Sequence, residues 1–90
     1  MTRSEIIQAV DDAIEKLRQP LPPEEHAFGW TDAKRLDILR YFENLVRDLR
    51  EDKTIPFFSL IRALDGMGIS EGELFEEVCR INNAVNRLSK

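Results

Sequence analysis

Hydrophobic positions recur at helical spacing in the last twenty residues of the chain. From Leu74 to Leu88 the apolar residues step by four, three, four and three, which is the spacing of a helix that packs along another helix. Ser70 and Glu73 stand just before this run with the spacing of a capping box. The pattern predicts a helix over residues 71–88 that begins from a Ser70 cap.

Two further amphipathic patterns predict helices over residues 3–18 and 32–50. Thr2 and Thr31 precede them and are suitable N-cap residues. In the second segment the apolar residues fill an arc about 160° wide on a helical wheel, wider than the ~100° stripe of a helix with one buried side. This width favours the segment 32–50 as the central element of the fold.

Residues 56–65 are apolar nearly all round a helical wheel and predict a short third helix in chain order. Pro56 suits its first turn, and the two glycines that follow it can end it. Three prolines within residues 20–23 must stop the first helix and favour an extended path. We therefore predict one all-α domain over residues 1–90, a small four-helix bundle-like domain with a Pro-rich connection between its first two helices.

Composition fits a folded domain, because 42% of the residues are hydrophobic and 33% are charged. The net charge of −4 argues against nucleic acid or an anionic membrane as a partner. The single cysteine excludes an intramolecular disulfide. The chain has no signal-peptide pattern and no run of ~20 apolar residues to span a bilayer, so we expect a cytoplasmic protein with no membrane partner.

Residues with catalytic chemistry are few and scattered. The only histidine, His26, stands in the Pro-rich connection, and no second histidine or cysteine is near it in sequence. Cys79 lies beside the apolar seam of its helix, where a small buried thiol is the simpler interpretation. No phosphate-binding or calcium-binding loop spacing occurs. We expect no enzyme activity, no cofactor and no metal site.

Residues 57–88 also permit a different interpretation, a helix-turn-helix subunit that binds DNA. In that motif the first residues of the second helix meet the bases, and here they include Glu71, Glu73, Glu76 and Glu77. Carboxylates in the major groove are repelled by the phosphates. We therefore keep DNA binding as the alternative and expect no nucleic-acid partner.

An excess of apolar side chains is the feature with functional weight. The helix over 56–65 has almost no polar side, and a 90-residue chain has little material to cover it. One outcome is that the Pro-rich connection folds over this helix. The other is an exposed patch that docks a second chain. An asparagine-rich strip beside the last helical seam can extend such a contact. The candidate interface residues are Phe28, Trp30, Phe58, Ile61, Met67, Phe75, Cys79, Asn82 and Asn86.

The sequence thus predicts a non-catalytic protein–protein interaction module: a small regulator, adaptor or inhibitor, in the size and charge range of immunity proteins and antitoxins. We expect a homodimer, since closed two-fold dimers are the commonest oligomers, or a complex with another protein. The alternatives are the DNA-binding subunit and, third, a small cofactor carrier or enzyme.

Overall fold

The structure is a computed structural model that describes residues 2–53 and 59–88. Its described residues form helices and connections, with no strand among them. The all-α prediction is confirmed. The helices are α1 (Arg3–Leu17), α2 (Pro23–His26), α3 (Asp32–Arg50), α4 (Leu60–Gly66) and α5 (Glu73–Leu88).

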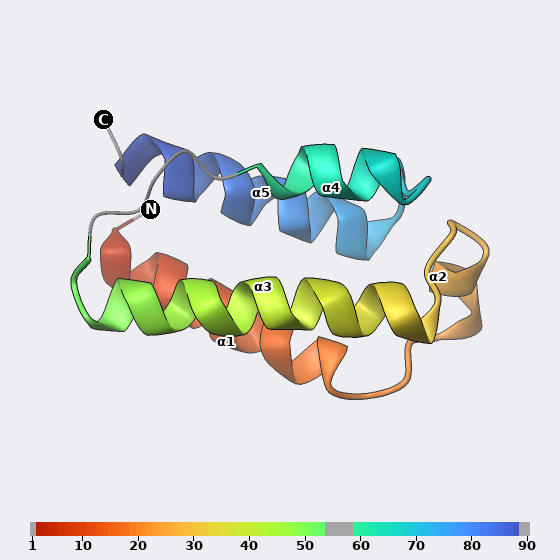
Figure 1. The fold of residues 1–90 in the computed structure, drawn as a ribbon, viewed down its shortest axis with the longest axis horizontal. Coiled ribbons are helices and arrows are strands. Elements are labelled where there is room, and N and C mark those ends of the chain that lie inside the picture. Colours follow the sequence, from red (N-terminus) through yellow and green to blue (C-terminus); the bar gives the residue numbers. More distant parts are fainter. Residues whose placement is uncertain (1, 54–58, 89–90) are drawn as a thin grey trace.

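The long helices form two layers. In Figure 1, α1 and α3 lie side by side in one layer, α4 and α5 form the other, and α2 lies at one end of the molecule. α1 packs against both α3 and α5, and α4 packs against α5. The central element is therefore α1, and the prediction that residues 32–50 hold this place is wrong. The finer prediction of a four-helix bundle is not confirmed, because α3 and α4 are not among the closely packed pairs.

The apolar seams of α1, α3 and α5 meet in one core. α1 buries a five-residue stripe that includes the small Ala13, so its two neighbours can approach it closely. Tyr41, at the edge of the wide arc on α3, is 49% exposed, and the buried face of α3 is therefore narrower than its apolar arc. The core residues of α3 and α5 are Ile38, Leu39, Phe42, Leu45, Leu49, Leu74, Val78, Ile81, Ala84 and Val85.

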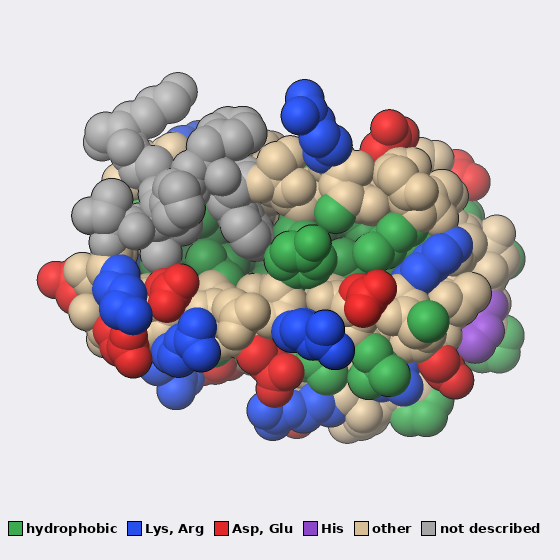
Figure 2. Space-filling view, in the orientation of Figure 1, with side chains coloured by type: hydrophobic (Ala, Val, Ile, Leu, Met, Phe, Trp, Pro, Cys, Tyr) green, Lys and Arg blue, Asp and Glu red, His purple; other side chains and the backbone are tan. Residues whose placement is uncertain are grey.

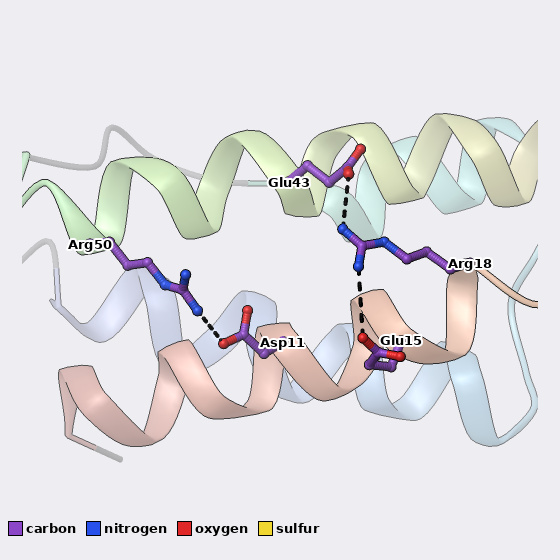
Figure 3. A network of polar contacts seen from close by, with 5 residues as sticks. All are labelled: Asp11, Glu15, Arg18, Glu43 and Arg50. Carbon is purple, nitrogen blue, oxygen red and sulfur yellow. Dashed lines mark hydrogen bonds and ion pairs between the residues drawn. The ribbon is translucent and has the colours of Figure 1, made fainter.

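Ion pairs join the outer faces of α1 and α3 (Figure 3). Arg50 of α3 reaches Asp11 of α1, and Arg18, just after α1, reaches Glu43 of α3 with 3.6 Å between Nη2 and Oε2. Arg18 also lies 3.7 Å from Oε1 of Glu15. These side chains are 35–70% exposed, so each pair contributes at most about 1 kcal/mol. They support the register of the α1–α3 pair, and apolar burial supplies most of its stability.

The Pro-rich connection is extended at first and then helical. Pro22 has φ −61° and ψ 154°, in the polyproline II region, and Pro23 opens the short helix α2, which the sequence did not predict. Gly29 follows with φ +105°. A Cβ atom there would lie 3.1 Å from the carbonyl oxygen of Gly68. The connection therefore folds back onto the turn between α4 and α5, and glycine permits this close approach.

Helix α4 begins later than predicted and ends as predicted. Ser59 lies within the predicted helix but has φ −131° and ψ 77°, which are not helical angles, and α4 begins at Leu60. The predicted first residue, Pro56, lies outside the described residues. At the end, the Gly68 N–H donates to the Asp65 carbonyl at 3.0 Å, and the Ile69 N–H donates to the Leu64 carbonyl at 2.9 Å. These two bonds define a Schellman motif, with Gly68 in the left-handed conformation.

Helix α5 also begins later than its local signal predicts. Its first residue is Glu73, and the carbonyl of Gly72 accepts the first helical hydrogen bond from the Glu76 N–H at 3.0 Å. Gly72 therefore holds the N-cap position, and the predicted cap at Ser70 is wrong. Gly72 has φ +110°, and a Cβ atom there would lie 2.7 Å from Cδ2 of Phe28. Glycine at this position permits both the positive φ, which is not helical, and the close approach of the Phe28 ring.

Candidate interaction surface

Two of the predicted interface residues are buried. Trp30 is only 2% exposed and belongs to the core, so its predicted place in an exposed patch is wrong. Asn82 is 4% exposed, and its Oδ1 accepts a hydrogen bond of 2.7 Å from the Leu60 N–H. That N–H is one of the donors at the start of α4 that have no acceptor within the helix itself, so Asn82 acts as a remote cap for α4.

The fold of the connection explains why Trp30 is buried. Trp30 follows Gly29, which lies against the turn after α4, so the chain carries the indole into the core. Phe28 is half-buried and lies against Gly72. The connection thus covers the end of α4 and the start of α5. Of the two predicted outcomes for the short helix, this is the one in which the Pro-rich segment folds over it. The segment covers one end of that helix.

Two other predicted interface residues, Ile61 and Phe75, come together in a hollow between α4 and the start of α5. The hollow has a volume of about 360 Å³, and both side chains are half-buried. We call it the α4–α5 hollow. It is lined by Ser59, Ile61, Arg62, Asp65, Ile69, Ser70 and Phe75.

Met67 lines a different hollow, on the side of α4 that faces α3. This α3–α4 hollow also has a volume of about 360 Å³. Figure 2 shows apolar side chains along the line where α3 faces α4, with charged side chains on both sides of them. The hollow is lined by Asp37, Arg40, Tyr41, Asn44 and Met67.

The sequence-based list missed the two most exposed large apolar residues of the described chain, Tyr41 at 49% and Leu36 at 48%. Tyr41 is one of the residues in the wide apolar arc that the sequence predicts for segment 32–50. It lies at the edge of this arc, which is wider than one buried side requires. This position is the sequence signal that could have identified it as exposed. No signal in the sequence marks Leu36.

The remaining predicted interface residues contribute less. Cys79 is half-buried, and burial, with a smaller effect from Glu76, raises the pKa of its thiol. The thiol is therefore protonated at neutral pH and is a weak nucleophile. Asn86 is half-buried, and Phe58 lies outside the described residues.

The described residues show no cluster of metal-binding side chains. They contain no group of three or more His, Cys, Asp or Glu side chains placed to hold a metal ion. His26 is exposed at the end of α2. No helix in the described ranges is long and apolar enough to cross a bilayer.

The start of α5 has the acidic character that the sequence predicts. Glu73 and Glu76 lie in its first turn, and Glu77 follows in the second. In a helix-turn-helix this end would enter the major groove, where phosphate repulsion opposes carboxylates.

Another hollow, of about 550 Å³, lies between α1 and α3. It is lined by the ion-pairing residues of Figure 3, so most of its charges already have partners.

Comparison of the chain with protein-family models, with curated proteins and with solved structures found no match. The surface around α4 thus remains the strongest feature from which to infer function.

Proposed function

We propose that this protein is a non-catalytic protein–protein interaction module that forms a homodimer through α4 and the two hollows beside it. The observation that carries the proposal is the exposure of Tyr41 beside one of these hollows. Tyr41 is an aromatic residue, half exposed, and lines the α3–α4 hollow together with the half-buried Met67. Tyrosine is enriched at interface hot spots because it offers a large apolar area and a polar tip.

Charges around the two hollows support a contact between identical chains. Asp37 and Arg40 line the α3–α4 hollow, and Arg62 and Asp65 line the α4–α5 hollow. None of the four forms an ion pair with another described residue. A two-fold contact brings one surface against itself, so a surface with both signs of charge can pair with its own copy.

The packing of the helices supports the same proposal. α3 and α4 are not among the closely packed helix pairs, and Figure 2 shows apolar side chains between the two layers, where a partner can contact them. The second copy would place α4 or α3 against this surface and complete a bundle of helices. In this proposal the protein acts in the cytoplasm as a small regulator, adaptor or inhibitor.

The test is the oligomeric state of the purified protein, measured by sedimentation equilibrium over a wide concentration range. We expect a dimer with a dissociation constant in the micromolar range, and Tyr41→Glu should raise that constant by at least roughly tenfold. Leu36→Glu is the matched control, since Leu36 is on the same helix, equally exposed and outside both hollows. A wild-type monomer at about 1 mM, or equal weakening by both variants, would overturn the proposal.

A further inference from the structure

A fourth hollow lies where α1, the Pro-rich connection and α2 meet the start of α5. It has a volume of about 360 Å³ and shares no lining residue with the two hollows beside α4. We call it the Glu25 pocket. Its lining residues are Lys16, Gln19, Pro20, Leu21, Pro22, Glu25, Glu73, Leu74 and Glu77.

Glu25 is the unusual member of this pocket. It is 7% exposed, and its Oε1 accepts a hydrogen bond of 3.4 Å from the Leu74 N–H at the start of α5. Its second carboxylate oxygen, Oε2, is buried and has no hydrogen-bond partner among the described residues. A buried carboxylate oxygen without a donor is costly, so Glu25 gains from a donor in the pocket once its carboxylate turns and exposes this oxygen.

The charge of the pocket favours a cationic donor. Three carboxylates line it, from Glu25, Glu73 and Glu77, and the only cationic lining residue is Lys16. Lys16 Nζ donates to Glu77 Oε2 at 2.8 Å. The remaining two carboxylates outweigh the positive end of α5, which is equivalent to about half a unit charge.

The walls and the donor geometry narrow the class of ligand. Leu21, Leu74 and two prolines supply apolar surface for an alkyl stem. A guanidinium presents several N–H donors in a planar fork and loses less hydration on burial than an ammonium does. One such group has enough N–H donors for the carboxylates of both Glu25 and Glu73, and Lys16 already pairs with Glu77.

We propose that the Glu25 pocket binds an alkyl guanidinium, either a small free molecule or an arginine side chain. Glu25 and Glu73 accept the hydrogen bonds of the guanidinium, and Leu21 and Leu74 contact the alkyl stem. The site is independent of the dimer contact at α4, because the two surfaces have no lining residue in common.

The test is a titration of the ¹⁵N-labelled protein, followed by the amide signals of residues 73 and 74. The probes are propylguanidinium, N-acetylarginine amide and the uncharged propylurea. Both cations should shift these signals in a saturable way, with propylurea binding at least roughly tenfold more weakly. Saturation by both cations assigns the site to an arginine side chain, and saturation by propylguanidinium alone assigns it to a small molecule.

Variants then connect the binding to Glu25. Glu25→Gln keeps an oxygen that can accept from the Leu74 N–H and removes the charge, so it should weaken cation binding by about tenfold or more. Glu24→Gln is the matched control, because Glu24 is the neighbouring exposed carboxylate of α2 and does not line the pocket. Glu73→Gln provides a second variant at an exposed position if Glu25→Gln unfolds. No shift with either cation, equal binding of propylurea, or equal effects of Glu24→Gln and Glu25→Gln would overturn the proposal.

Discussion

Helices α1 and α3 begin differently from helices α4 and α5. Thr2 and Thr31 cap the first pair from the adjacent position, each accepting a 3.2 Å hydrogen bond from the N–H three residues on. The second pair is capped from far along the chain. Asn82 accepts from the Leu60 N–H, 22 residues away, and Glu25 accepts from the Leu74 N–H, 49 residues away. Local sequence thus specifies where one layer's helices begin, whereas the folded chain specifies this for the other layer.

The ends of the helices receive help from distant residues in both layers. Arg35 donates to the Leu17 carbonyl at the end of α1, at 2.6 Å. Arg3 Nε donates to the Leu49 carbonyl at the end of α3, at 3.0 Å. Lys34 Nζ donates to the Met67 carbonyl after α4, at 2.7 Å, and also to the Gly29 carbonyl. Cations suit the negative ends of helices. Because Lys34 and Arg35 are in the first turn of α3, this turn joins both layers.

Among the substitutions that test this difference between the layers, Asn82→Ala should have the largest effect on the free energy of unfolding. The substitution leaves the Leu60 N–H without its acceptor inside the core, which costs about 1–3 kcal/mol of unfolding free energy. Asn83→Ala is the matched control, since Asn83 is an exposed asparagine one position on in the same helix. It should leave stability unchanged or raise it slightly, because alanine favours a helix. Urea denaturation of both variants measures the difference, and equal midpoints would contradict the role of Asn82 as a cap.

A smaller effect should distinguish a true local cap from a false one. Thr31→Ala removes the oxygen that accepts from the Lys34 N–H, and we expect a loss of about 1 kcal/mol. Ser70 has a similar sequence signal but lies two residues before the cap position at Gly72, so Ser70→Ala should change stability by less than about 0.5 kcal/mol. Chemical denaturation of the two variants under one set of conditions provides the comparison. A loss of about 1 kcal/mol in Ser70→Ala would mean that α5 begins earlier than the structure places it.

The difference between the layers also explains how much of the fold could be predicted. α1 and α3 begin at the residues that their threonine caps predict, because the cap and the apolar stripe adjoin in sequence. The sequence predicts the start of α5 too early because Ser70 and Glu73 imitate a capping box, whereas Gly72, with a positive φ and the Phe28 ring against it, directly precedes the first helical residue. That contact joins residues 44 positions apart and has no trace in either local sequence.

The candidate surface could be predicted only in part, for a related reason. Hydrophobicity placed Ile61, Met67 and Phe75 at α4 and near it, where they line the two hollows. It could not distinguish them from Trp30, which has equal apolar character and is buried because the connection turns inward at Gly29. Composition identifies which side chains are apolar enough to favour burial, and only the path of the chain determines which of them are buried.

The smallest effect concerns the acid stability of the local cap on α1. The Thr2 N–H donates to Glu5 Oε1 at 2.9 Å, and this bond, followed by the Thr2 hydroxyl, lowers the pKa of the Glu5 carboxyl. Because the folded pKa lies below the unfolded one, the charge on Glu5 stabilises the fold at pH values above the unfolded pKa. That contribution is lost as the pH falls through the folded pKa. Glu5→Gln keeps the capping-box geometry and removes the charge. The wild type should therefore be more stable than Glu5→Gln near neutral pH, and the difference should vanish in acid. Urea denaturation of both proteins at a series of pH values measures this, and a difference that does not change with pH would refute the role of the charge.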